Sequence, residues 1–274
     1  MGIDFVGGSL TEVTYQILAD SENLGFRSFD IETALQGVGF TSVLVQPTEE
    51  TGFFIRTLAL SESERVLLLE TLETLGSFEE DSFTSIGPSL GRELQNKALI
   101  ALIVVALAII MFIAYVFRSV SKPVSSWKYG FVAVVTLLHD VILTAGAFGL
   151  LSMFMVGVEV NALFVVALLT VLGLSVNDTI VVFDRIRENL KENNGKKPFK
   201  EVVGKSLSET YTRSINTSLS TLIVLIVLAI VGPASTKVFA LTLAFGMFFG
   251  TYSSIFLASP LLVLLSEKAV SQKD

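Results

Sequence analysis

Long apolar stretches fill the chain from about residue 98 onward and alternate with short polar segments. Each stretch approaches or exceeds the roughly 20 residues that a helix needs to cross the hydrocarbon core of a bilayer. In lipid, a helix satisfies all of its own backbone hydrogen bonds, so the pattern predicts membrane-spanning helices. The five predicted spans lie at about 98–117, 129–151, 160–183, 215–231 and 238–265.

The first 97 residues follow a different pattern, with short alternating and amphipathic segments. Ser61 and Glu64 form a capping-box pattern before an amphipathic helix at 65–75, which carries leucines at 68, 72 and 75. A second, shorter helix is predicted at 31–37, after Asp30. Strands are predicted at 9–16, 41–46, 52–60 and 78–86, with a turn at 47–51 and a strand-like, Gly-rich segment after Met1.

This order, β-α-β-β-α-β, is that of a ferredoxin-like fold. We therefore predict an α-helical polytopic membrane protein with a small α+β, ferredoxin-like external domain. The external domain comprises residues 1–97 and the transmembrane domain residues 98–274. Because the ferredoxin-like fold serves many functions, it indicates little about activity by itself.

Charge is distributed unevenly along the chain. The first 97 residues hold 16 of the 26 acids and 5 of the 19 bases. The connections after the first and third predicted spans are basic, whereas the opposite loops are short and carry Glu159 and Lys237. The positive-inside rule places the basic loops in the cytoplasm and the acidic domain outside. We expect a further span upstream of Met1, since nothing in residues 1–97 would carry them across. The basic residues are Arg118, Lys122 and Lys128, then Arg185, Arg187, Lys191, Lys196, Lys197, Lys200, Lys205 and Arg213.

The amino-acid composition limits the kinds of chemical site that the chain can form. The chain has no cysteine and one histidine, so we expect no disulfide, no metal site and no cofactor. An intramembrane enzyme would need a nucleophile–base pair or a metal site, and the sequence shows neither. The basic loop at 185–205 contains interspersed acids and lies between spans, which favours a topogenic role over nucleic-acid binding.

Ionisable residues occur inside the predicted spans, where each costs roughly 3 kcal/mol on insertion scales. Asp178 lies in the inner half of the third span, and we favour a functional, proton-exchanging role for it. Arg213 stands at the cytoplasmic end of the fourth span, at a similar depth, so a proton on Asp178 would weaken its attraction to Arg213. His139 and Asp140 are adjacent in the second span and point about 100° apart, so at most one of them needs to face a relay.

The alternative for every such residue is structural, because polar side chains also hydrogen bond neighbouring membrane helices. We favour this interpretation for the helix-interface residues Asn216, Ser218 and Ser220. A stripe of small residues in the last span predicts close helix packing. Further helix-interface candidates are Asn177 and Thr179, and the stripe comprises Gly246, Gly250, Ser254 and Ala258.

Several segments resemble the SecF family of protein-export membrane proteins, part of the SecD/SecF family in the resistance–nodulation–division superfamily. Residues 175–189, with the letters SVNDTIVVFDRIREN, are similar to nearly the whole fourth-span signature of that family. The resemblance extends in order over nearly the entire chain. The other matching segments are Gly2–Gly8 (GIDFVGG), Gly87–Gly91 (GPSLG), His139–Val141 (HDV) and Arg213–Ser218 (RSINTS).

The resemblance implies six spans, a multi-pass location in the cell (inner) membrane, and use of the proton motive force to promote late steps of preprotein translocation. It implies SecD, the SecYEG channel, YajC, the translocating preprotein and membrane lipid as partners. It assigns proton-relay roles to Asp178 and Arg213, with Asp140 and His139 as further candidates. A small-molecule or lipid exporter of the same superfamily is the alternative, although such exporters usually carry larger external domains. A passive assembly subunit is another.

Overall fold

The structure is a computed structural model, and it describes residues 1–16, 28–48, 52–116, 125–155, 158–193, 196–232 and 234–271. The chain forms two compact units, which we describe separately. The first comprises Met1–Leu99 and Leu151–Ala162, and the second comprises Ile100–Leu150 and Leu163–Asp274. The basic residues Arg118 and Lys122 and part of the turn at 47–51 lie outside the described residues.

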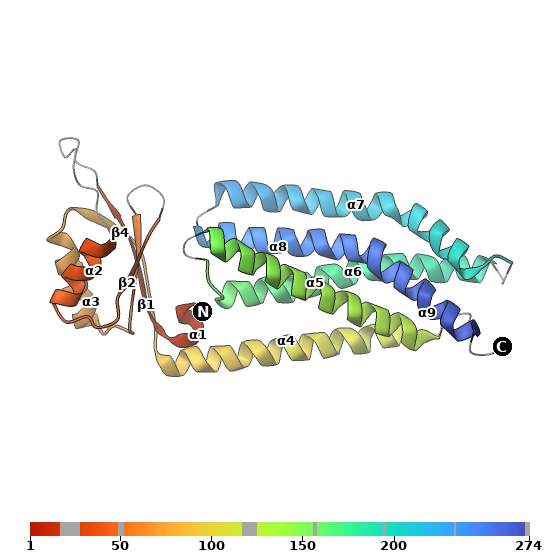
Figure 1. Cartoon of the computed structure of the whole chain (residues 1–274), viewed down its shortest axis with the longest axis horizontal. Helices are drawn as coiled ribbons and strands as arrows, with labels where there is room; N and C mark the ends of the chain where they lie inside the picture. The colour runs from red at the N-terminus through yellow and green to blue at the C-terminus, as the bar shows by residue number, and fades with distance from the viewer. Residues whose placement is uncertain are drawn as a thin grey trace. The chain divides into compact units, whose positions relative to one another are not determined.

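The first unit contains a four-stranded antiparallel sheet with two helices on one face (Figure 1). The β-α-β-β-α-β order is confirmed, and the strands are arranged β2-β3-β1-β4, with β1 and β3 in the centre. The elements are α1 (Ile3–Val6), β1 (Gly8–Tyr15), α2 (Ser28–Gly37), β2 (Leu44–Pro47), β3 (Gly52–Thr57), α3 (Glu62–Glu73) and β4 (Phe78–Ile86).

Alternation along the strands gives this unit its core. Side chains of β1, β2 and β3 on one face of the sheet pack against α2 and α3, and Leu68 and Leu72 of α3 are fully buried. Tyr15 packs edge-to-face on Phe53 and donates its hydroxyl to the Leu72 carbonyl oxygen at 3.2 Å. Burial raises the pKa of the Tyr15 phenol to about 12.

The predicted capping box is present at the start of α3. The Ser61 hydroxyl accepts from the Glu64 backbone N–H, and the Glu64 carboxylate accepts from the Ser61 backbone N–H at 2.8 Å. Hydrogen bonds from the Ser61 side chain and backbone lower the pKa of the Glu64 carboxyl. The exchange satisfies two backbone donors at a helix end that has no other intrahelical partners for them.

The segment after Met1 is not strand-like, contrary to the prediction. Residues Ile3–Val6 form one helical turn, closed by a hydrogen bond of 2.8 Å from Gly7 N–H to the Ile3 carbonyl. Gly7 then adopts φ 79°, a left-handed conformation that favours glycine, and the chain enters β1 at once. The glycines that made this segment look strand-like instead flank a helical turn.

The second unit consists of long helices that lie side by side (Figure 1). Five helical segments of the described chain are long and apolar enough to cross a membrane, as predicted, with the last formed by α8, a π-helical turn and α9 together. The first four are α4 (Pro88–Val116), α5 (Ser126–Phe154), α6 (Ala162–Asn193) and α7 (Phe199–Val231). The fifth comprises α8 (Ala234–Ser253), the π-helix Ser254–Ala258 and α9 (Ser259–Ser271).

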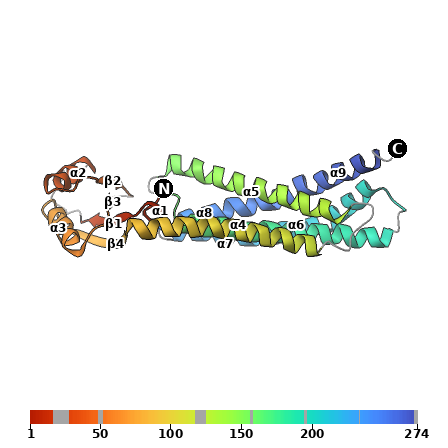
Figure 2. The same cartoon turned by 90° about the horizontal axis from the view of Figure 1, so that it is seen from below.

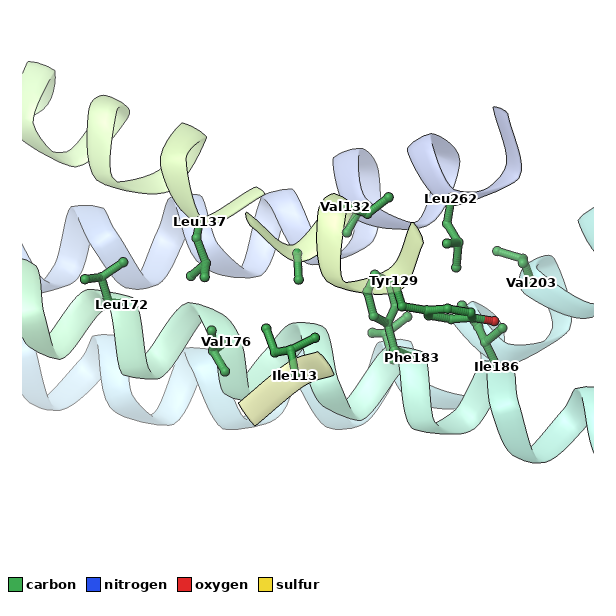
Figure 3. Packing of buried hydrophobic residues seen from close by; sticks show 13 residues of the cluster. Ile113, Tyr129, Val132, Leu137, Leu172, Val176, Phe183, Ile186, Val203 and Leu262 are labelled. Carbon is green, nitrogen blue, oxygen red and sulfur yellow. The ribbon is translucent and has the colours of Figure 1, made fainter. Parts of the chain in front are cut away.

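Apolar side chains from α4, α5, α6, α7 and α9 meet in one buried cluster (Figure 3). Tyr129 of α5 and Phe183 of α6 stack edge-to-face with ring centroids 5.3 Å apart, and both side chains are fully buried. Ile113 of α4 and Leu262 of α9 complete the cluster from other helices. Tight packing at this point fixes the rotation of α6, and therefore the direction in which its polar residues face.

The π-helix Ser254–Ala258 interrupts the last span, and the helix axis changes direction there (Figure 2). A π-turn widens the i→i−4 pattern and frees backbone groups, and it is a recognised cause of such kinks. The Ser259 hydroxyl donates to the Ser254 carbonyl oxygen at 3.2 Å, which satisfies one acceptor of the widened turn.

The core of the first unit can be tested on α3. Leu68→Ala should lower the free energy of unfolding of this unit by about 2–5 kcal/mol, because the side chain is fully buried and its loss leaves a cavity. Leu67→Ala is the matched control, since Leu67 is 40% exposed on the same helix. Amide hydrogen exchange of β1 and β3 in the full chain measures the difference. Equal acceleration of exchange in both variants would contradict the assigned helix face.

Candidate functional site

Asp178 lies on α6 with its side chain buried inside the second unit. It follows Ser175 by one helical turn, and both face the packed side of the helix. The Thr251 hydroxyl of α8 lies 3.1 Å from Asp178 Oδ2, and the Ser218 hydroxyl of α7 lies 3.4 Å from the same oxygen. One oxygen of a carboxyl group in a membrane helix is thus contacted by hydroxyl groups from two neighbouring helices.

Asp140 of α5 forms a second buried site of the same kind. Its Oδ2 atom accepts hydrogen bonds from the hydroxyls of Ser175 on α6 and Ser253 on α8, the latter at 2.7 Å. Its Oδ1 atom lies 2.9 Å from Nδ1 of His139, which is half-buried. The adjacent pair thus contact each other, and within the part of the chain that the structure describes, hydrogen bonds to other helices come from Asp140 and not from His139.

Both sites depend on a close approach of α6 and α8. A Cβ atom on Gly250 would lie 3.1 Å from Cβ of Ser175, and one on Gly246 would lie 2.9 Å from Cβ of Val171. Two glycines one turn apart therefore let the two backbones come together. This approach brings Thr251 and Ser253, whose side chains are short, within hydrogen-bond distance of carboxyl groups on other helices.

The remaining predicted residues fall into two groups. Thr179 and Ser218 are buried between helices, and the stripe residues Ser254 and Ala258 are buried within the π-helix. Arg213, Asn177 and Asn216 are exposed on the surface of this chain. Among the described residues, Arg213 makes no ion pair or hydrogen bond. The expected attraction between Arg213 and Asp178 is therefore not accompanied by a direct contact between the two side chains.

Three contacting residues were not singled out from the sequence: Ser175, Thr251 and Ser253. Ser175 lies within the segment that resembles the family signature, and Thr251 and Ser253 lie beside the stripe of small residues. The sequence signal for Thr251 and Ser253 is the concentration of hydroxyl residues at 251, 253 and 254 in an otherwise apolar span. Hydroxyls hydrogen bonded to the preceding turn cost little in lipid, so composition alone does not mark them as partners of an acid.

The start of α6 and the loop before it are held by hydrogen bonds and an ion pair within the first unit. Asp4 Oδ2 accepts from the backbone N–H of Ala162 at 2.8 Å, and Gly2 N–H donates to the Val160 carbonyl at 2.8 Å. Arg56 of β3 forms an ion pair with Glu159, the acid of the short loop. A carboxylate at a helix N-terminus satisfies a free backbone donor and complements the helix dipole. These contacts give Gly2 and Asp4 of the segment after Met1 a structural role.

The chemistry available at these sites is proton binding and hydrogen-bond exchange. Among the described residues, no group of three His, Cys, Asp or Glu side chains lies close enough together to hold a metal ion. The polar atoms around Asp178 are hydroxyl oxygens, which can donate to a carboxylate or accept from a carboxylic acid. The arrangement can therefore accommodate the carboxyl group in either protonation state.

The α6–α8 contact can be tested by Gly246→Ala. The added methyl group would overlap Val171, a stiff β-branched residue, so the variant should lose about 1–3 kcal/mol of stability. Gly130→Ala on α5 is the matched control, because nothing lies within 4 Å of a Cβ built there. The stability of the two purified variants is compared by thermal unfolding, with size-exclusion chromatography used to detect the loss of folded protein. A Gly246→Ala variant as stable as Gly130→Ala would show that the helices can separate freely.

Comparison with known proteins places this arrangement in a family. Residues 68–268 match the family model described as "Protein export membrane protein SecD/SecF, C-terminal". The protein translocase subunit SecF of Thermobaculum terrenum is 40% identical to the chain, and the alignment covers 98% of the chain and 85% of that protein. SecF of a Synechocystis species is 37% identical, with 95% of the chain and 81% of that protein covered.

Solved structures agree with these relatives. The crystal structure of SecDF from Thermus thermophilus, described as a translocon-associated membrane protein, matches with a TM-score of 0.81 at 30% identity, over 97% of the chain. A structure of SecDF in a super-membrane-facing form matches with a TM-score of 0.66 at 29% identity. The chain spans about a third of the length of each SecDF protein, 34% and 35% respectively. It is a multi-pass membrane protein, and it belongs to the SecF branch of the SecD/SecF family of protein-export membrane proteins.

Proposed function

We propose that this chain acts as the SecF subunit of a SecDF complex and uses the proton motive force to promote late steps of preprotein translocation. The observation that carries the proposal is Asp178, an acid buried within a membrane-spanning helix and contacted by hydroxyl groups from two other helices. No covalent bond is made or broken in this role, so the chain is not an enzyme in the usual sense.

The energetic argument starts from the cost of such a residue. An acid near the middle of the membrane costs roughly 3 kcal/mol on insertion scales, so the position is expected to serve a purpose beyond packing. An asparagine or serine could hydrogen bond the same neighbours without that cost. A carboxyl group differs from them in one property, which is that it can gain and lose a proton. We therefore assign proton binding to Asp178, with Asp140 as a second candidate.

The partners follow from the family and from the exposed polar groups. Arg213, Asn177 and Asn216 are exposed on membrane helices of this chain, and a charge there needs a partner or access to water. A SecD subunit is our candidate for covering this surface, because the matching structures are of SecDF. We further propose the SecYEG channel, YajC and the translocating preprotein as partners in the assembled machinery, with lipid around the remaining helices.

Asp178→Asn tests the proton-binding role. The shape of the side chain is retained while the exchangeable charge is lost, so the variant should assemble with SecD but lose proton-gradient-dependent stimulation of export. Stimulation is measured in vesicles that contain the full-length subunits, with and without an uncoupler. A purely structural role predicts the opposite pattern, with weaker assembly and normal coupling in whatever assembles. Normal gradient-driven stimulation in a well-assembled variant would rule out the proton-binding role.

Arg213→Ala tests whether this residue and Asp178 act together. We expect a similar loss of stimulation, and the double variant should be little worse than either single one, because groups that act as one unit are not additive. Tyr211→Ala is a control, since Tyr211 is another exposed residue on α7. Additive losses in the double variant would indicate that Arg213 contributes separately, for example through assembly.

A further inference from the structure

The two hydroxyls that contact Asp178 also contact each other. Ser218 Oγ and Thr251 Oγ1 lie 2.6 Å apart, and both are within reach of Asp178 Oδ2. Each also lies close to a carbonyl of its own helix. The Ser218 hydroxyl is 2.8 Å from the Ser214 carbonyl oxygen, and the Thr251 hydroxyl is 2.9 Å from the Met247 carbonyl oxygen.

The two hydroxyls have only two protons to share among these acceptors, since each hydroxyl carries one. When Asp178 is charged, Thr251 can donate to its Oδ2 atom while Ser218 donates to Thr251. When Asp178 has taken up a proton, its own O–H becomes a donor to one of the hydroxyl oxygens. Thr251 and Ser218 can then turn their protons to the Met247 and Ser214 carbonyls. Asp178 Oδ2 and both hydroxyls thus keep a hydrogen-bond partner in both states, and the exchange requires only that the hydroxyl protons turn.

We propose that Ser218 and Thr251 are positioning residues for Asp178, which hold its carboxyl group in both protonation states by rotating their hydroxyl protons. The inference deepens the proposed function and rests on it, because it assigns the residues through which the same carboxyl group is held. Removing either hydroxyl leaves Asp178 Oδ2 with one hydroxyl partner in place of two, in a low-dielectric environment where each lost hydrogen bond to a carboxyl group is costly.

The other ionisable groups do not supply an alternative partner. Among the described residues, Asp178 has hydrogen bonds to Ser218 and Thr251 and to no charged side chain. The buried Asp140 takes its donors from a different set, namely Ser175, Ser253 and His139. The further ionisable residues within about two turns of these contacts are Asp184 and Arg185 on α6, Tyr211 and Arg213 on α7, and Tyr252 on α8.

The test compares four hydroxyl variants of the full-length protein, assembled with SecD in lipid nanodiscs, and uses Asp178→Asn as the spectral reference. Thr251→Val keeps the shape of the side chain and removes the hydroxyl, and Ser218→Ala does the same for its partner. Thr251→Ser restores a hydroxyl and is the rescue variant. Thr242→Val is the matched control, because Thr242 is a buried threonine of the same helix whose hydroxyl donates to the Val238 carbonyl of that helix at 2.8 Å.

Infrared spectroscopy reads the hydrogen bonding of Asp178 directly. The carboxyl bands are assigned by subtracting the Asp178→Asn spectrum, in both the neutral C=O region and the carboxylate region. We expect the Asp178 bands to shift in Thr251→Val and Ser218→Ala, to return in Thr251→Ser, and to stay in place in Thr242→Val. Unshifted bands in both Thr251→Val and Ser218→Ala would overturn the proposal.

Export measurements separate this proposal from the proposed function. Thr251→Val should reduce gradient-dependent stimulation about tenfold, which corresponds to losing one hydrogen bond to a charged group, and should have no further effect in an Asp178→Asn background. If Asp178→Asn itself leaves stimulation normal, the proposed function fails while the infrared result still decides the hydroxyl assignment. If Asp178→Asn abolishes stimulation but Thr251→Val and Ser218→Ala leave it unchanged, the positioning role alone is wrong.

Discussion

A carboxyl group within a membrane helix must find hydrogen-bond partners inside the protein, and the packing of the second unit follows from this requirement. Water is absent from the hydrocarbon core, and an unpaired polar group there costs several kcal/mol. Asp178 is satisfied only because α7 and α8 both bring a hydroxyl to one of its oxygens. Asp140 imposes the same condition on α5, α6 and α8. The last span supplies a hydroxyl donor to each of the two acids.

Short side chains can meet this requirement only where helices lie close together. Serine and threonine reach little beyond their own backbone, so α8 has to approach α6 closely, and Gly246 and Gly250 permit it. The apolar cluster around Tyr129 and Phe183 then fixes the rotation of α6. Packing and polar chemistry are therefore coupled, because neither the glycines nor the hydroxyls could be replaced by larger residues without separating the acids from their donors.

Sequence predicted most of the fold because the physical rules involved are local. Span length, strand alternation and the Ser61–Glu64 capping box depend on neighbouring residues, and all three appear in the structure. The turn at Ile3–Val6 was missed because the glycines on either side of it resemble those of an extended segment, whereas Gly2 and Gly7 lie against residues far along the chain.

The candidate site was only partly predictable. Asp140 and Asp178 stand out in the sequence because acids are rare in apolar spans, and both are buried. Their partners Ser175, Thr251 and Ser253 are common residues of membrane helices, and only the tertiary arrangement shows that they face an acid. Arg213 also stands out in the sequence, but similar depth along two helices does not require that two residues face each other, so its role with Asp178 stays a prediction.

The π-helix in the last span affects the direction in which the side chains after it face. A π-turn accommodates about one residue more than an uninterrupted α-helix, and each residue of an α-helix adds about 100° of rotation. If the same residues were wound as a regular α-helix, everything after Ser254–Ala258 would be turned by about that angle relative to α8. Leu262 would then leave the cluster that contains Ile113 and Tyr129, while Thr251 and Ser253 would keep their places. The π-turn thus lets this sequence present its hydroxyls to two acids and, further along, an apolar side chain to the core, which the same residues could not do as one regular α-helix.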